Sequence, residues 1–407
     1  MRNEGGPMSP NAIAVMVKAL AKGKLGLGAL TGLERFLLSQ VALPDRVPTM
    51  LVATNIEPYD IDEKYNYVVT TTRPEANLEL FEKVRRRFKA DTIVVPVWMG
   101  LLTTGAAELG TRFKIEERRV PYAVEHPIRD RRDLENMRVP AAAGGYMKMY
   151  FDLNLEAQRR YPDTLIFPVF DGPWDLAMLL RGDHDLPRDL RLHKDYVETD
   201  DPRRRERIRS VGDPDLYPAI MELTTRLAIR HVGLAKEHGL NLMGSTLVDQ
   251  FATKPVLSME DFIRYVLPYI ERVWRAHHKK LGIGYMYTSP DDIEKGMQNG
   301  TLRQGGGMTA YGNYTFPQTP DGVSLPEYDR RMLEMVKRDH KCYGYLIHGK
   351  FIRDASKQEL EDLVQRVCSM ATEMRARMSL GMVSIPPGTD LNKIDLVLRL
   401  VEKYGRY

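Results

Sequence analysis

The stretch Tyr343-Gly344-Tyr345-Leu346-Ile347-His348, followed by Met378-Ser379-Leu380-Gly381-Met382-Val383, decides the fold of this chain. Each stretch is a short, mostly apolar run without strict alternation, which is typical of a strand buried on both faces of a parallel sheet. The segment between them includes Lys357–Arg375, which is long enough to form a helix and has a composition that favours one. Strand, helix and strand in this order predict a parallel βαβ unit.

The same alternation extends through the chain from residue 49. Eight apolar runs are expected to be strands: Thr49–Thr54, Thr92–Val97, Leu165–Val169, Leu240–Gly244, Gly282–Tyr287, Gly307–Tyr311, Tyr343–His348 and Met378–Val383. Further helices are expected at Glu75–Phe88, Pro218–Glu237, Ser258–Lys280 and Leu325–His340. Eight such units predict an α/β fold, a (β/α)8 TIM barrel, over residues 49–407.

Two regions depart from the regular alternation. The connection from Gly100 to Asp163 is long and is expected to carry extra elements. Residues 1–48 are expected to form a helical N-terminal extension, with one helix at Leu33–Gln40 that ends before Pro44 and Pro48. Proline stops a helix because it lacks an amide hydrogen and restricts the residue before it.

Composition excludes several classes of protein. The 407 residues are 43% hydrophobic and 28% charged, with 59 Lys plus Arg against 55 Asp plus Glu. The net charge of +4 is too small to indicate a nucleic-acid partner. The two cysteines exclude a disulfide scaffold and a four-thiolate zinc site. No apolar run approaches the ~18 residues that a membrane span needs, and the first residues do not resemble a signal peptide. A cytoplasmic enzyme is therefore expected.

The active site of such a barrel lies at the carboxyl ends of its strands, an opening called the mouth below. The side chains expected there are rich in aromatic rings and poor in arginine, which suits a flat, largely apolar ligand with a few polar anchors. The candidate substrate-binding residues are Asn55, Glu57, Trp98, Trp174, Asp249, Asn313 and Tyr314.

Proton transfer requires a titratable side chain at the mouth. His348 is the histidine that the strand pattern places there, so it is a candidate for proton transfer or metal ligation. Asp171 and Asp249 are candidate bases or anchors, although each side chain could instead accept hydrogen bonds from loop amides. Cys342 and Cys368 lie away from the mouth and are expected to be inert.

The strongest charge run is Asp200-Asp201-Pro202-Arg203-Arg204-Arg205-Glu206-Arg207. Its simplest interpretation is the solvated start of a helix, with acids at the end that the helix dipole favours. The alternative is a site for a phosphate or an acidic partner.

Five sequence blocks, in order, resemble the uroporphyrinogen decarboxylase superfamily, which includes methyltransferases that use a corrinoid protein. The similarity covers most of the chain and is carried by Leu33–Phe36 with Leu43–Pro48, Gly105–Gly110 with His126–Ile128 and Asp133–Leu134, Gly172–Ala177 with Leu180–Gly182, Val256–Phe262 with Leu267–Tyr269, and Ile385–Thr389 with Tyr404–Tyr407. The resemblance implies the same (β/α)8 barrel.

Two departures from family patterns bear on the substrate. The arginine-rich segment of the true decarboxylase is missing, which counts against a substrate with many carboxylates. Members that methylate thiols hold zinc with His-x-Cys after strand five and Cys near strand eight, whereas this chain has Tyr285-Met286-Tyr287 and Gly381–Ser384 there. The resemblance then points to the branch that moves a methyl group from methoxylated aromatic compounds to cobalamin.

In that branch His348, Tyr285 and Tyr287 are the expected donors to the leaving oxygen, with Asp171 as a further catalytic candidate. Some relatives hold zinc through acids and a histidine, and here Glu327 and His348 resemble half of that spacing. No Asp-x-His-x-x-Gly cobalamin motif occurs, so the resemblance implies cobalamin on a partner corrinoid protein. A small aromatic or apolar substrate is expected, with neither nucleic acid nor membrane as a partner, and a homodimer is left open. The alternatives are a cofactor-free decarboxylase and a non-catalytic barrel that binds a tetrapyrrole or corrinoid.

Overall fold

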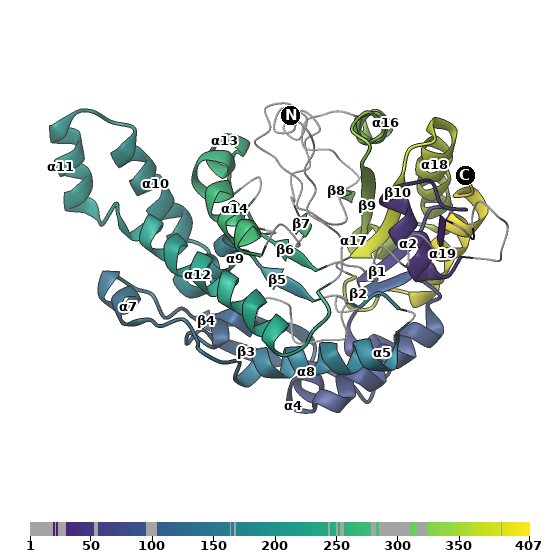
Figure 1. Ribbon diagram of the computed structural model, residues 1–407, viewed down its shortest axis with the longest axis horizontal. Coiled ribbons are helices and arrows are strands. Elements are labelled where there is room, and N and C mark those ends of the chain that lie inside the picture. The colour runs from purple at the N-terminus through teal and green to yellow at the C-terminus, as the bar shows by residue number, and fades with distance from the viewer. Residues whose placement is uncertain are drawn as a thin grey trace.

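The structure is a computed structural model that describes residues 19–20, 22, 30–52, 56–94, 104–162, 164–166, 168–242, 245–249, 251–252, 256–277, 282–284, 310–315, 324–383 and 385–407. Eight parallel strands form its centre (Figure 1). They are β1 Thr49–Val52, β2 Thr92–Val94, β5 Val169–Asp171, β6 Thr246–Val248, β7 Gly282–Gly284, β8 Ala310–Thr315, β9 Cys342–His348 and β10 Met378–Val383.

The order of these strands is that of a (β/α)8 barrel. One sheet has the order β2-β1-β10-β9-β8 and the other the order β5-β6-β7, with every pair parallel. The last strand, β10, pairs with the first, which is the contact that closes such a barrel. Within the described residues no ladder joins β2 to β5 or β7 to β8. The predicted fold is confirmed, including the parallel pairing of β8 with β9.

One predicted strand was wrong in position. Leu240–Gly244 was expected to be a strand, but β6 begins at Thr246. Leu240 instead closes the preceding helix, because its amide donates to the Ala235 carbonyl and Gly239 adopts a φ of 92°. This is a Schellman motif, in which the residue after the glycine also makes an apolar contact with the helix. Similarly, β5 begins at the last residue of its predicted run.

Helices alternate with the strands and cover the barrel (Figure 1). Before β5 they are α2 Gly32–Ser39, α3 Pro58–Ile61, α4 Tyr67–Thr72, α5 Pro74–Arg87, α6 Thr104–Ala107, α7 Arg131–Asn136 and α8 Gly145–Arg160. After it come α9 Pro173–Arg181, α10 Asp185–Val197, α11 Pro202–Val211, α12 Leu216–Glu237, α13 Met259–Asp261, η3 Phe262–Val266, α14 Leu267–Ala276, α16 Leu325–Arg338, α17 Gly349–Asp354, α18 Lys357–Met374 and α19 Leu391–Tyr404. In the part of the chain that the structure describes, none of these helices is both long and apolar enough to cross a membrane.

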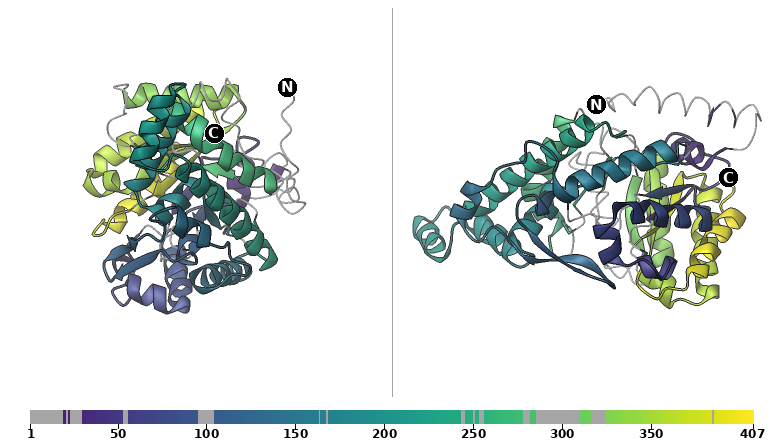
Figure 2. Two further views of the ribbon diagram at one scale, coloured as in Figure 1. Left: turned by 90° about the vertical axis from the view of Figure 1, so that its left-hand side faces the viewer. Right: turned by 90° about the horizontal axis from the view of Figure 1, so that it is seen from below.

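The long connection after β2 carries the extra elements that were predicted. It contains α6, α7, α8 and an antiparallel hairpin of β3 Arg112–Glu116 and β4 Arg119–Glu125. A second extension comes after α9, where α10 and α11 project from the barrel as a helical arm (Figures 1 and 2).

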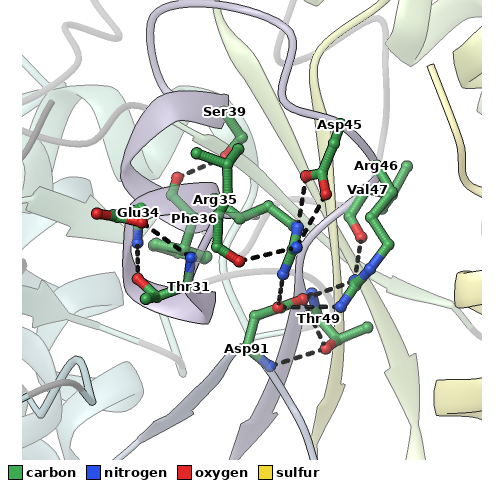
Figure 3. A network of polar contacts seen from close by, with 11 residues as sticks. Thr31, Glu34, Arg35, Phe36, Ser39, Asp45, Arg46, Val47, Thr49 and Asp91 are labelled. Carbon is green, nitrogen blue, oxygen red and sulfur yellow. Dashed lines mark hydrogen bonds and ion pairs between the residues drawn. The ribbon is translucent and has the colours of Figure 1, made fainter. Parts of the chain in front are cut away.

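The segment before β1 is bonded to the start of the barrel (Figure 3). Helix α2 begins with a capping box between Thr31 and Glu34. Arg35 in this helix forms two hydrogen bonds to Asp45, at 2.6 and 2.9 Å, and a further ion pair with Asp91. Asp91, which precedes β2, also accepts from Arg46 at 2.7 Å and from the Thr49 amide at 2.8 Å.

This network explains why the Leu33–Phe36 and Leu43–Pro48 blocks occur together. Asp91 is buried, with 8% of the residue's surface exposed. The hydrogen-bond donors around its carboxylate therefore replace the water that the charge would otherwise require. The blocks serve to attach α2 beneath β1 and β2. Whether residues 1–48 form a separate unit stays a prediction, because residues 1–18 lie outside the described residues.

Candidate active site

Two acidic side chains come together at the carboxyl ends of neighbouring strands. Asp171 is the last residue of β5 and pairs in register with Val248 of β6. Asp249 directly follows Val248. Both residues are buried, with 3% and 5% of their surface exposed. The Phe170 ring contacts His231 of α12 at 5.3 Å between ring centres, so Phe170 faces the outer helices. Successive side chains of a strand alternate, and Asp171 therefore faces the inside of the barrel.

Asp249 caps a helix that belongs to the other strand. Helix α9 begins after Gly172, which has no side chain to cap it. The carboxylate of Asp249 accepts the Asp175 amide at 2.9 Å and also bonds the Trp174 amide. These are two of the donors that a helix N-terminus leaves without an internal partner.

The Gly-Pro-Trp block has a structural reason in this arrangement. A Cβ atom on Gly172 would lie 2.1 Å from the Asp249 Oδ2 atom, which is far inside van der Waals contact. Glycine at this position therefore lets the carboxylate approach the helix. Pro173 follows at the first helical position, where its fixed φ and missing amide hydrogen are best tolerated.

Burial makes both carboxyls hard to ionise. The pKa of Asp171 is raised well above its ordinary value by burial first and by the charge of Asp249 second. The pKa of Asp249 is also raised by burial, against the lowering effect of the α9 amides. One oxygen of each carboxyl, Oδ2, has no hydrogen-bond partner among the described residues. Two neighbouring buried carboxylates favour holding a proton, so the pair can donate one at neutral pH.

His348 lies at the carboxyl end of β9, as predicted. Its Nδ1 atom accepts the Lys350 amide at 3.2 Å and thereby caps α17. An acceptor at Nδ1 places the proton of the neutral ring on Nε2, which makes that atom a donor. Burial, with a smaller contribution from the Lys350 charge, lowers the pKa of His348 and favours this neutral form.

Glu57 follows β1 and is almost completely buried, with 1% of its surface exposed. Arg118, from the turn between β3 and β4, forms an ion pair with it at 3.0 Å between Nε and Oε1. Burial raises the pKa of Glu57, and the Arg118 charge opposes that shift. Sequence analysis did not single out Arg118, and the only signal was a pair of arginines in a tight turn.

His231 of α12 was also missed. It is 1% exposed and packs between the rings of Phe151 and Phe170, and neither ring nitrogen has a hydrogen-bond partner in the part of the chain that the structure describes. Burial lowers its pKa to about 4. It sits in an apolar helix, where the sequence pattern indicates only core. His231 lies on the outer side of β5, behind Phe170 and away from the face of Asp171.

The remaining candidates fall into four groups. Trp174 is fully buried, and its ring lies 6.3 Å from that of Tyr217. Glu327 is in the first turn of α16 and pairs with Arg330. Asn313 and Tyr314 are in β8, whose backbone is described. Tyr285, Tyr287, Asn55 and Trp98 lie outside the described residues.

The described residues do not fit a zinc ion. No group of three or more His, Cys, Asp or Glu side chains among them could hold a metal. Glu327 is paired with Arg330, and the Nδ1 acceptor of His348 fixes the tautomer in which Nε2 carries a proton. A metal at Nε2 would require that proton to leave and the bond to Lys350 to break.

The comparisons with known proteins agree with the barrel fold. The family model described as uroporphyrinogen decarboxylase (URO-D) matches residues 40–404. Among solved structures, a methyltransferase from Methanosarcina mazei is similar, with a TM-score of 0.66 at 14% sequence identity. That similarity covers 88% of this chain and 94% of the methyltransferase. No curated protein matches the sequence.

Proposed function

Because the chain belongs to the uroporphyrinogen decarboxylase family, we propose that it is a methyltransferase that moves a methyl group from a small methoxylated aromatic compound to the cobalamin of a corrinoid protein. The single observation that carries this proposal is the pair of buried carboxyls, Asp171 and Asp249, at the ends of β5 and β6, where burial raises the pKa of both. Breaking an aryl ether requires an acid for the leaving oxygen, and this pair holds a proton where the barrel binds its substrate.

A reduced corrinoid, when bound, supplies the nucleophile that takes up the methyl group. The bond between the ether oxygen and the methyl carbon breaks, and its electron pair stays on the oxygen. The carboxyl pair gives its proton to that oxygen, so the phenol leaves neutral and the pair gains one negative charge. A proton from water then restores the pair.

Other residues support this step. The Nε2 proton of His348 is a second candidate donor to the leaving oxygen, and the bond from Lys350 fixes its ring. The amides of α9 bind the Asp249 carboxylate and favour its charged form, which leaves Asp171 as the better acid of the pair. The aromatic substrate-binding residues predicted from the sequence would exclude water from the reacting atoms.

The test is incubation of the protein with reduced cobalamin and a panel of methoxylated aromatic compounds, with separate measurement of released phenol and of methyl uptake. Asp171→Asn should lower turnover by roughly 100- to 10,000-fold, the range for losing general acid catalysis. Asp329→Asn is the matched control, because Asp329 is buried, its pKa is raised to about 6, and it pairs with Arg366 between α16 and α18.

The control variant should keep the parental rate. An equal loss of turnover in both variants would mean that replacing any buried acid impairs the protein through folding alone. That result would contradict the proposed role of Asp171 as the acid. Release of carbon dioxide from an aromatic acid, without methyl uptake, would instead favour the decarboxylase alternative.

A further inference from the structure

The helical arm of α10 and α11 stands beside the candidate active site. Lys194 of α10 pairs with Asp261 of α13 at 2.7 Å, and Glu198 pairs with Arg264 at 2.8 Å. Both partners come shortly after β6, on the side of its carboxyl end. At the start of α12, Tyr217 packs against Trp174, which follows the end of β5. The base of the arm is therefore at the rim of the mouth, and α11 projects from it (Figures 1 and 2).

The arginine content of helix α11 and the placement of its arginines do not favour the helix. Five of its ten residues are arginine, and none of the ten is buried. Arg203, Arg204 and Arg205 occupy the first turn, where the helix dipole disfavours positive charge. Arg203 and Arg207 are four residues apart, as are Arg205 and Arg209, and like charges at this spacing destabilise a helix.

Part of this charge is used within the arm. Arg205 and Arg209 lie over the ring of Tyr196, at 5.5 and 4.9 Å from its centre. Arg204 makes a loose pair with Asp195 at 3.6 Å. These contacts hold one side of α11 against α10.

The opposite side is unpaired. Arg203 and Arg207 form no ion pair with any residue that the structure describes, and Val211 is 79% exposed. The three residues are spaced by four, so they share one face of the helix. This basic face, Arg203, Arg207 and Val211, combines two arginines with an apolar side chain that is largely exposed among the described residues. Arginine beside exposed apolar surface is typical of protein interfaces.

We propose that the basic face of α11 docks the acidic surface of the protein that carries the corrinoid to the mouth. The inference rests on the proposed function, because that function requires a second protein to approach the rim. An acidic partner would offset the repulsion among the arginines and would be steered to the rim by its charge. A protein fits better than a nucleic acid, because Glu206 interrupts the arginines and Tyr196 is covered by two of them instead of free for stacking.

The experiment compares three proteins. The first is the parent, and the second carries Arg203→Glu with Arg207→Glu. The third is a matched control with Arg159→Glu and Arg160→Glu, which makes the same change in net charge at the far end of α8. Both control arginines are exposed and pair with Glu156 of the same helix. The probes are a cobalamin-loaded corrinoid protein of negative net charge, free reduced cobalamin and a short DNA duplex.

The α11 variant should bind the corrinoid protein roughly tenfold or more weakly at low salt, mainly through a slower association rate. The control should bind within about twofold of the parent, since isolated exposed pairs contribute little. Added salt should lower the affinity of the parent for the corrinoid protein until it approaches the affinity of the α11 variant. Methyl transfer to free cobalamin should be equal in all three proteins.

Equal affinity of the parent and the α11 variant for the corrinoid protein would overturn the docking proposal. So would tighter binding of the parent to the DNA duplex than to the corrinoid protein. Failure of the parent to methylate free cobalamin with any substrate would instead count against the proposed function, and the binding comparison would still decide the role of α11.

Discussion

Asp171 and His231 lie on opposite faces of the region around β5, and burial shifts their pKa values in opposite directions. The pKa of Asp171 is raised, so the folded protein binds a proton at a pH where the unfolded chain, with a carboxyl pKa of about 3.9, has lost it. The pKa of His231 is lowered to about 4, so the unfolded chain binds a proton that the folded protein refuses. The first effect removes stability as pH rises, and the second removes it as pH falls.

In the Asp171→Asn variant, the free energy of unfolding should therefore fall less steeply as pH rises. The parent loses free energy of unfolding as pH rises from about 4 through the raised pKa of Asp171, whereas the amide has no proton to lose. Urea unfolding at about pH 5 and about pH 8 measures the difference. Parallel profiles for the two proteins would show that Asp171 is not protonated in the folded state.

His231→Phe should act on the acidic side. The variant should be more stable by about 1–3 kcal/mol, because it removes an unpaired polar group from a site between two aromatic rings. The parent should lose stability as pH falls from 6.5 to about 4, and the variant should not show this contribution. A variant that is less stable than the parent at every pH would indicate a buried partner for the ring.

At the scale of elements, α9 depends on a carboxylate from the loop after β6. Gly172→Ala places a methyl group where the Asp249 carboxylate sits, so the carboxylate must move and α9 loses its cap. We expect a loss of about 1–3 kcal/mol of unfolding free energy, the range for losing a cap or introducing a clash. Thermal unfolding measures it.

Gly233→Ala is the matched control, because it is inside α12 and its added Cβ would meet only Arg230 Nη1, at 3.9 Å. That variant should gain up to about 1 kcal/mol, because alanine favours a helix over glycine. Losses of the same size in both variants would argue against the role of Asp249 as a cap.

Most elements were predictable because buried parallel strands and amphipathic helices leave a local pattern. The predicted and observed bounds agree closely for α18, β9 and β10. The prediction failed at Leu240, whose apolar side chain serves the end of α12 instead of a strand. Asp171 and Asp249 were expected shortly after two strands, and both strands lie further along the chain than predicted, so Asp171 ends β5 and Asp249 follows β6 directly. Their pairing could not be predicted, since it depends on the register of β5 with β6 and on a contact between Gly172 and Asp249, 77 positions further along.

At the scale of the whole molecule, Asp91 joins the segment before β1 to the barrel. Asp91→Ala would leave the guanidinium groups of Arg35 and Arg46 beside an apolar side chain (Figure 3). Breaking a buried ion pair by removing one partner costs about 3–5 kcal/mol. Urea unfolding of the variant should show that loss in one transition, because α2 and the barrel share the network.

Asp152→Ala serves as the comparison. Asp152 is half exposed and pairs with Lys148 and His238 on the surface of α8. Its loss should cost less than about 1 kcal/mol. Similar losses in both variants would mean that the network around Asp91 contributes no more than an ordinary surface pair.

The cap that Asp249 gives to α9 has a consequence for deuterium exchange. The amide hydrogens of Trp174 and Asp175 are bonded to a carboxylate from another loop and not to carbonyls of their own helix. Their exchange with solvent therefore reports whether the loop after β6 is seated, even when α9 itself stays folded. A ligand that orders this loop would slow exchange at these two amides before it changed any other part of the helix, so binding at the mouth can be followed in the unmodified protein.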